Sequence, residues 1–315
     1  MHIPDGFLDL KTITATSTLS VMGVGWALRN MKNYTTPKKV PLVGLAAAFI
    51  FVAQMINFPV ASGTSGHLVG ATLIAVLLGP CAAIIVMTSV LIVQCLLFAD
   101  GGLLTLGANI FNMAIVGTVV GYGIYRLLRP FLKGDRGRII SVAFASWCTV
   151  VVASIVCAGE IAWSGTAPWE GVFPAMASIH MLIGVGEALI TGMVIVAISR
   201  TRPELLYESI SDDSQKHRSG LPLYTGLAII GVLLFVAPFA SPFPDGLEKV
   251  AGLLGFEYKV PPHAIIASPW SDYHIPGIAS ASSATIIAGI LGAVIVFGLS
   301  FLLARILVPR NPTDS

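Results

Sequence analysis

Long apolar runs alternate with short polar or basic stretches along the whole chain. Most runs approach the roughly 20 residues that an α-helix needs to cross the hydrocarbon core of a bilayer. We mark nine of them, over residues 12–30, 40–58, 67–79, 80–98, 103–128, 139–163, 172–198, 221–241 and 284–306. The third is short because Gly79-Pro80 ends it. The pattern predicts an all-α integral membrane protein.

The basic residues gather in alternate loops. Lys and Arg occur in loops 29–39, 126–138 and 199–220 and in the tail from Arg305, whereas loops 59–66, 99–102 and 164–171 contain none. Cytoplasmic loops of membrane proteins carry the excess of Lys and Arg. Because an odd number of crossings puts every basic loop on one side, we expect a multi-pass plasma-membrane protein. Its N-terminus is expected outside and its C-terminus in the cytoplasm.

A polar stretch divides the apolar segments into seven and two. Residues 201–220 are charged and Ser-rich, which is typical of a cytoplasmic linker. We therefore expect a seven-helix substrate-binding module over residues 1–200 and a two-helix module over residues 221–315. The last two helices are joined by a long outside loop rich in Pro and Gly, and loops of that length are usually functional or mobile.

Composition narrows the class of protein further. The chain has 315 residues, of which 55% are hydrophobic and 11% charged, a balance that excludes a disordered chain and an ordinary soluble domain. Membrane lipids are its expected surroundings, and the scattered Lys and Arg residues give no sign of nucleic-acid binding. The four cysteines lie inside apolar runs without a C-x-x-C pair, so we interpret them as core thiols.

Catalytic chemistry is not indicated. No G-x-x-x-x-G-K-[ST] motif occurs, so ATP hydrolysis by that route is not expected and active transport would need a partner or an ion gradient. A membrane enzyme would need convergent acid and base groups, and only His180 and Glu187 offer them. A channel would need rings of polar residues, which the helices lack. We expect a transporter subunit that is not an enzyme, without catalytic or cofactor-binding residues.

The opening dipeptide Met1-His2 has the chemistry of a metal chelate. No secretory signal peptide is evident, so we expect the mature protein to begin at or near Met1. The terminal amine and the His2 amide nitrogen close a five-membered ring with a metal ion, and the amide with His2 Nδ1 closes a six-membered ring. These three nitrogens lie nearly in one plane, a geometry typical of Ni(II) or Cu(II), and one equatorial position stays open.

His67 is the candidate for the fourth position. The charge map puts it on the same outer face as Met1 and His2, at the start of the third helix. It follows the small, flexible loop 61–66, which allows close approach and offers hydroxyl groups. Taken by its position alone, His67 is better explained as a helix cap or an interfacial residue than as a metal ligand. The predicted metal ligands are Met1, His2 and His67.

Other intramembrane polar residues have two interpretations each. Asn109 and Asn112 share a helix face and either bond to another helix or brace the N-terminus. His180 and Glu187 are spaced i, i+7, and a structural pair or a coupling role fits them better than metal binding. Asp100 begins a tight turn with two glycines.

Small residues recur on two helices and allow close helix contact. On the first helix they are Thr16, Ser20, Gly23 and Ala27, which we interpret as a weak pointer to a docking partner. On the fifth helix, Gly117 and Gly121 are explained equally well by packing within the chain.

Several stretches resemble one known family. They are Met1-His2-Ile3-Pro4-Asp5-Gly6-Phe7-Leu8, Gly63-Thr64-Ser65-Gly66-His67-Leu68-Val69-Gly70, Leu97-Phe98-Ala99-Asp100-Gly101-Gly102, Gly107-Ala108-Asn109-Ile110-Phe111-Asn112-Met113 and His180-Met181-Leu182-Ile183-Gly184-Val185-Gly186-Glu187-Ala188. Over residues 1–200 the chain is similar to the CbiM/NikM proteins, the substrate-capturing subunits of energy-coupling factor transporters for cobalt and nickel. The resemblance implies that the Met1 amine, the His2 amide and imidazole, and His67 bind the metal.

The end of the chain resembles a second family. Pro244-Asp245-Gly246-Leu247-Glu248-Lys249-Val250-Ala251 is similar to the signature of the small CbiN/NikN subunit, so the chain looks like a fused subunit. The resemblance implies a transmembrane coupling protein and paired cytoplasmic ATP-binding subunits as partners. Planar nitrogen ligands and the fused arrangement favour Ni(II) as the transported substrate. Co(II) uptake for cobalamin synthesis by the same mechanism is the alternative, and a gradient-driven carrier or a channel is another.

Overall fold

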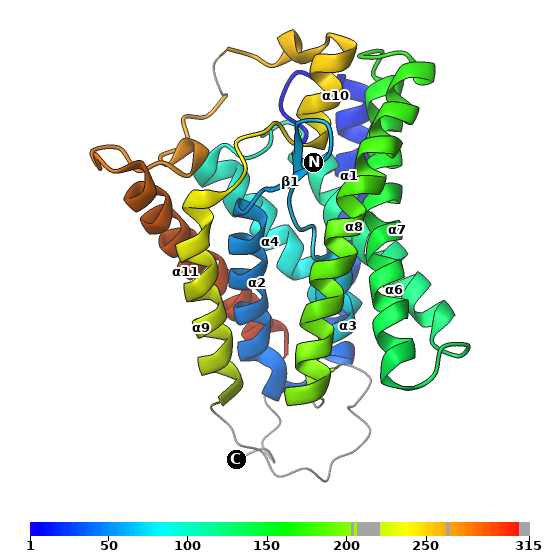
Figure 1. The fold of residues 1–315 in the computed structure, drawn as a ribbon, viewed down its shortest axis with the longest axis vertical. Helices are drawn as coiled ribbons and strands as arrows, with labels where there is room; N and C mark the ends of the chain where they lie inside the picture. The colour runs from blue at the N-terminus through cyan, green and yellow to red at the C-terminus, as the bar shows by residue number, and fades with distance from the viewer. Residues whose placement is uncertain (203–204, 207–220, 263–264, 309–315) are drawn as a thin grey trace.

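The protein is a bundle of long helices with one short β-hairpin, seen in a computed structural model that describes residues 1–202, 205–206, 221–262 and 265–308 (Figure 1). The principal elements are α1 (Leu10–Tyr34), α2 (Val40–Met55), β1 (Phe58–Val60), β2 (Thr64–Gly66), α3 (Ala71–Leu78), α4 (Pro80–Phe98), α5 (Leu106–Asn109), η2 (Ile110–Val116), α6 (Gly117–Leu128), α7 (Gly134–Trp163), α8 (Trp169–Thr201), α9 (Leu221–Val236), α10 (Gly246–Leu254) and α11 (Ala281–Leu307). The predicted all-α fold class is confirmed. Most of the predicted linker 201–220 lies outside the described residues.

Within the described residues, six helical stretches are long and apolar enough to cross a membrane. They run over Pro37–Met55, Pro80–Phe98, Leu106–Leu128, Gly134–Trp163, Trp169–Thr201 and Ala281–Leu307. The fifth predicted segment contains α5, the π-helical turn η2 and α6 in succession, which makes one continuous helix with a widened turn. The division into seven and two crossing helices stays a prediction.

The third predicted segment differs from expectation. Only Ala71–Leu78 is helical, which spans about 12 Å at 1.5 Å per residue, and His67 therefore precedes the helix instead of beginning it. The residues between β2 and α3 are non-helical and buried, so their backbone groups need partners from elsewhere in the protein.

Two buried side chains supply those partners. The Glu187 carboxylate on α8 accepts hydrogen bonds from the Val69 and Gly70 amides at 2.7 and 2.8 Å. The Gln54 side chain on α2 donates to the Val69 carbonyl at 3.0 Å. Irregular backbone at membrane depth is tolerated when protein groups satisfy it, and these two helices do so here. Glu187 therefore has the structural role that the sequence favoured, with a loop and not with His180 as its partner.

The small-residue faces are occupied within the chain. On α1, the Ser20 hydroxyl donates to the Gly107 carbonyl, and a Cβ on Gly23 would meet Ile115 at 2.4 Å. This face is therefore packed against α5 and η2, and the idea that it docks a partner is wrong. A Cβ on Gly121 would meet Thr72 at 2.0 Å, so packing within the chain explains that glycine.

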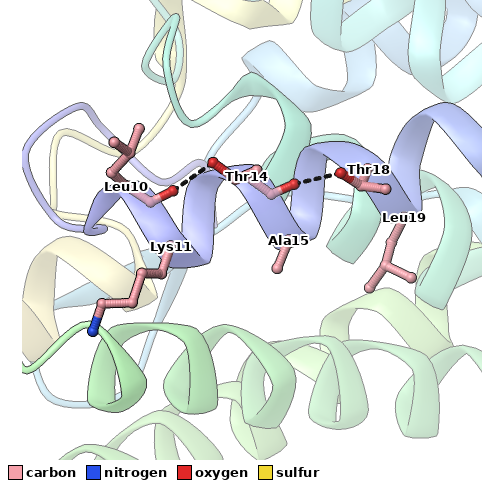
Figure 2. A pocket seen from close by; sticks show the side chains of 6 residues that line it. All are labelled: Leu10, Lys11, Thr14, Ala15, Thr18 and Leu19. Carbon is pink, nitrogen blue, oxygen red and sulfur yellow. Dashed lines mark hydrogen bonds between the residues drawn. The ribbon is translucent and has the colours of Figure 1, made fainter.

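The exposed side of α1 has a different character. A hollow lined by Leu10, Lys11, Thr14, Ala15, Thr18 and Leu19 runs along it (Figure 2). The Thr14 and Thr18 hydroxyls donate to the carbonyls one turn earlier, so they offer no free donor. This lining contains no His, Asp or Glu, and we assign it no metal chemistry.

Three of the four cysteines are core residues, as predicted. All four are free, with Cys81, Cys95 and Cys157 buried and Cys148 partly buried. A buried thiol away from metal or basic partners packs like a small apolar side chain.

The C-terminal part, residues 221–308, lies against the rest of the bundle along two surfaces. α9 and α11 stand beside α2 (Figure 1), where a Cβ on Gly292 of α11 would meet the Phe51 ring at 2.1 Å. α10 covers the first half of α8, where a Cβ on Gly246 would meet the His180 ring at 2.7 Å. This second surface brings the loop between α9 and α11 to the N-terminus.

Replacing Glu187 by Ala should destabilise the protein by roughly 2–6 kcal/mol, because it leaves two buried amides without an acceptor and each costs about 1–3 kcal/mol. Thermal unfolding of the detergent-solubilised protein measures the change. Glu170→Ala is the matched control, since Glu170 is an exposed carboxylate on the same helix. Equal melting temperatures for the two variants would contradict the assigned role.

Candidate metal centre

The N-terminal segment is held by hydrogen bonds to the residues around the start of α5. The Asn109 side chain accepts from the Ile3 amide at 2.7 Å and donates to the Ile3 carbonyl at 3.1 Å. The same carbonyl accepts from the Gly102 amide and the Thr105 hydroxyl at 2.9 and 2.6 Å. Of the two interpretations of Asn109, bracing of the N-terminus is the one observed.

Asp5 fixes the same segment from the other side. Its carboxylate accepts from the Leu103, Leu104 and Thr105 amides at 2.9–3.3 Å. A Cβ on Gly102 would come within 2.3 Å of the Asp5 backbone nitrogen, so glycine is needed there for close approach. The chain entering α1 therefore has a defined path, and Met1 and His2 are carried to a fixed place.

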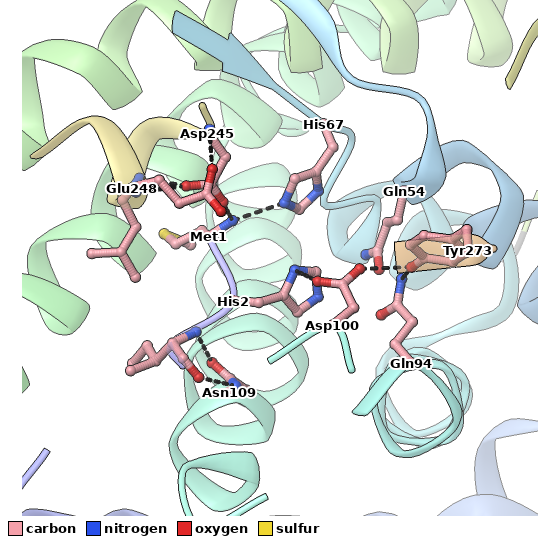
Figure 3. A network of polar contacts seen from close by, with 12 residues as sticks. Met1, His2, Gln54, His67, Gln94, Asp100, Asn109, Asp245, Glu248 and Tyr273 are labelled. Carbon is pink, nitrogen blue, oxygen red and sulfur yellow. Dashed lines mark hydrogen bonds and ion pairs between the residues drawn. The ribbon is translucent and has the colours of Figure 1, made fainter. Parts of the chain in front are cut away.

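The Met1 amine is buried between two side chains from distant parts of the sequence (Figure 3). It lies 2.8 Å from Nε2 of His67 and 2.7 Å from Oδ2 of Asp245. His67 Nδ1 lies 3.2 Å from the Leu68 carbonyl, which can only accept, so Nδ1 carries the proton and Nε2 presents a lone pair to the amine. Met1 and His67 thus lie together, as the sequence predicted.

His2 lies beside His67 with the two rings stacked at a centroid distance of 5.2 Å. Its Nδ1 is 3.0 Å from Oδ1 of Asp100. Asp100 in turn accepts from the Tyr273 hydroxyl at 2.6 Å, and the Gln94 side chain donates to that hydroxyl at 3.4 Å. The ring nitrogen expected to bind the metal is therefore held by a carboxylate in this structure.

Burial sets the charge state of this cluster. Burial lowers the pKa of His2, and the attraction of Asp100 only partly opposes it. Burial and the adjacent Met1 ammonium lower the pKa of His67 well below the usual value for histidine. Burial would raise the pKa of Asp245, but the charge and hydrogen bond of the Met1 ammonium outweigh it and hold that pKa well below its usual range. Both imidazoles are thus neutral, the form that binds metal ions.

The centre opens onto a cleft of about 790 Å³ whose lining includes His2, His67, Asp100, Asp245 and Tyr273. Among the described residues, no group of three or more His, Cys, Asp or Glu side chains is arranged to hold a metal ion. A metal site at this position therefore depends on backbone nitrogen in addition to imidazole.

Asn112 and His180, two further candidates from the sequence, lie outside the contacts around Met1 and His2 or at their edge. Asn112 donates to Glu160 on α7 at 2.8 Å, which is the hydrogen bond between helices that the sequence offered as its first interpretation. His180 is 2% exposed and bonds through Nδ1 to the Met176 carbonyl. Its Nε2 has no hydrogen-bond partner in the described part of the chain.

Sequence reasoning missed three residues of the centre. Asp100 was interpreted as a turn residue and as part of a family stretch, and Asp245 only as part of a family signature. Tyr273 gave no signal at all, because a tyrosine in a long loop has no distinguishing pattern. The Asp245-Gly246-Leu247-Glu248 stretch does match a capping box, and the structure confirms that the Asp245 side chain caps α10.

Comparison with known proteins places the chain in a family. The profile described as "Cobalt uptake substrate-specific transmembrane region" matches residues 2–205, and that of the "PDGLE domain" matches residues 219–309. The chain is 36% identical over 97% of its length to the "Putative fused nickel transport protein NikMN" of Archaeoglobus fulgidus, 98% of which is covered. It is 32% identical over 64% of its length to the "Cobalt transport protein CbiM" of Streptomyces coelicolor, covering 87% of that chain. A solved structure of a "transition metal transporter" is 35% identical with a TM-score of 0.57, over 64% of this chain and 93% of that one.

Replacing Asn109 by Ala should loosen the N-terminal segment, because both hydrogen bonds to Ile3 are lost. Amide hydrogen exchange over residues 1–8 should rise on the order of tenfold, corresponding to about 1.4 kcal/mol for the lost bonds. Asn112→Ala serves as the control, since it removes a buried amide from the same helix without touching the segment. Similar exchange in both variants would argue that Asn109 does not brace the N-terminus.

Proposed function

Because the chain belongs to the cobalt uptake substrate-specific transmembrane family, we propose that it captures Ni(II) for an importer of the energy-coupling factor type. As a member of this family it is a component of nickel or cobalt transport. In the proposed mechanism the ion is chelated outside the cell, and partner ATPases then drive its delivery across the membrane.

The observation that carries the proposal is the 2.8 Å separation of the Met1 nitrogen and His67 Nε2. Metal–nitrogen bonds are about 2.0 Å long, so neighbouring nitrogens of a square plane lie roughly 2.8 Å apart. The separation is also that of an ordinary hydrogen bond. It nevertheless means that these two nitrogens need not move relative to each other when an ion replaces the shared proton.

The His2 imidazole supports the same site. For an ion to bind Nδ1, the ring proton must move to Nε2, which is buried and has no partner in the described part of the chain. The Gln94 carbonyl oxygen also lacks a partner there, and Gln94 lies close enough to His2 to raise its pKa. Gln94 is therefore placed to accept the relocated proton, and Asp100 then faces the ion with its negative charge.

The distribution of charge supports capture from outside. The basic loops joining α1 to α2 and α6 to α7 lie at one end of the bundle, and Met1 lies toward the other (Figure 1). The positive-inside rule assigns the basic end to the cytoplasm. In this orientation the cleft beside His2 opens to the exterior.

The choice of nickel depends on ligand chemistry. An amine, a backbone amide and two imidazoles form a planar nitrogen set, which suits Ni(II). Relatives of this chain are named as nickel and as cobalt transport proteins, so Co(II) uptake is the alternative. A coupling protein in the membrane and cytoplasmic ATP-binding subunits are the proposed partners.

Replacing His67 by Ala should lower nickel affinity at least about 100-fold and disturb the planar nickel absorption band, because one of four ligands is lost. Acetylation of the Met1 amine should have a similar effect, since it converts the amine into an amide. Nickel titration and absorption spectra of the purified protein measure both. His274→Ala, an exposed histidine, is the control. Undiminished nickel binding by the acetylated protein would reject the terminal chelate.

Transport should require the partner subunits. Vesicles containing this chain with a coupling protein and ATPases should accumulate radioactive nickel when ATP is supplied, and vesicles containing this chain alone should not. An excess of Ni(II) should compete more strongly than Co(II) at the same concentration. Flux through the chain alone would favour a channel or a gradient-driven carrier, and stronger competition by Co(II) would make cobalt the substrate.

A further inference from the structure

Asp245, from the C-terminal part of the chain, contacts the Met1 amine in the candidate metal centre. It is not one of the proposed metal ligands. We propose that Asp245 is a positioning residue for the Met1 amine, orienting its lone pair toward the metal ion and adding negative charge beside it. The inference rests on the proposed function and deepens it, because it makes residues 221–308 part of the metal site.

The contact geometry at the amine defines this role. A metal-bound primary amine keeps two N–H groups and directs its lone pair at the ion. Asp245 Oδ2 lies 2.7 Å from the Met1 nitrogen and can accept one of these N–H groups. The bond to Cα and the N–H group that points at Asp245 fix two of the four directions at the Met1 nitrogen, so the amine cannot rotate freely. The lone pair is then directed into the space that His67 Nε2 also faces.

The carboxylate itself is held firmly. Its other oxygen, Oδ1, accepts from the Leu247 and Glu248 amides at 2.8 and 2.9 Å, so Oδ2 is left for Met1. The Glu248 side chain completes the capping box by accepting from the Asp245 amide at 2.9 Å. Gly246 follows with no room for a Cβ against the His180 ring, so the turn lies close against α8.

The same segment also fixes the loop that carries His67. The Ser65 amide donates to the Pro244 carbonyl at 2.8 Å, and the Ser65 hydroxyl donates to the Phe243 carbonyl at 2.6 Å. Two consecutive carbonyls and the Asp245 side chain therefore hold both partners of the 2.8 Å Met1–His67 pair. A carboxylate that bonds a metal ligand raises its basicity and fixes its orientation.

The direction of the effect follows from the hydrogen bond at the amine. In the metal-free protein Asp245 also stabilises the ammonium, which competes with metal binding. The chelate releases one ammonium proton and the His2 amide proton for one divalent ion, so the net charge stays the same, and the bond from the metal-bound amine to Asp245 sets the direction. Loss of a hydrogen-bond partner of a metal ligand typically weakens binding 10–100-fold.

Three variants of the full-length chain test the inference by nickel titration against a competing chelator, with absorption spectra. Asp245→Ala should weaken nickel binding at least about tenfold and alter the planar band. Asp245→Asn keeps the helix cap and an acceptor oxygen, so it should fold normally and fall between wild type and Asp245→Ala. Glu248→Ala is the matched control, because it breaks the other half of the capping box without touching the amine.

The outcomes separate the two ideas. If His67→Ala loses nickel while Asp245→Ala binds it as tightly as wild type or tighter, the proposed function stands and the role of Asp245 is overturned. If Glu248→Ala weakens binding as much as Asp245→Ala, stability of α10 explains the effect and the inference also fails. If His67→Ala binds nickel normally, the proposed site and the inference fall together.

Discussion

The burial of the Met1 amine is the constraint on which the rest of the centre depends. A charged amine removed from water is costly unless it is paired and hydrogen-bonded. Here the partners are His67 and Asp245, which are 66 and 244 residues away in sequence. Each must be carried to the amine by its own structure: an extended stretch before α3 for His67, and the capped start of α10 for Asp245.

The helices supply the rigidity that those irregular stretches lack. The stretch after His67 has no regular secondary structure of its own, so Glu187 on α8 and Gln54 on α2 satisfy its backbone. The position of His67 thus depends on two helices that are far apart in sequence. The distance between Met1 and His67 is consequently a property of the whole bundle and not of either local sequence.

Local sequence patterns predicted the helices and part of the centre. Hydropathy located the apolar helices because a run of about 20 apolar residues indicates a helix that crosses the bilayer. Chelate chemistry pointed to Met1 and His2, and the charge map put His67 on the same face. Whether these residues bind metal stays a prediction, but the structure does bring them together.

The failures have one physical cause, which is pairing over long distances in sequence. The third segment looked helical because its residues are apolar. Its first part stays non-helical because Glu187 and Gln54, which are distant in sequence, supply the hydrogen bonds that its backbone needs. The Asp100 turn and the Asp245 cap were both readable as local features. Their second contacts, to His2 and Met1, depend on how loops meet at the end of the bundle, and a single sequence carries no signal for that.

The local charges make the centre attractive to a cation. Without metal, the one ammonium of Met1 faces two carboxylates, Asp245 and Asp100, since burial keeps His2 and His67 neutral. The cluster therefore has one excess negative charge. A divalent ion in the proposed chelate would replace one proton of the ammonium and the proton of the His2 amide, so this excess would stay beside the ion, where a low-dielectric site strengthens the attraction. One of these carboxylates belongs to the C-terminal part, and the other is held by Tyr273 from that part, so both ends of the chain set the charge that the ion meets.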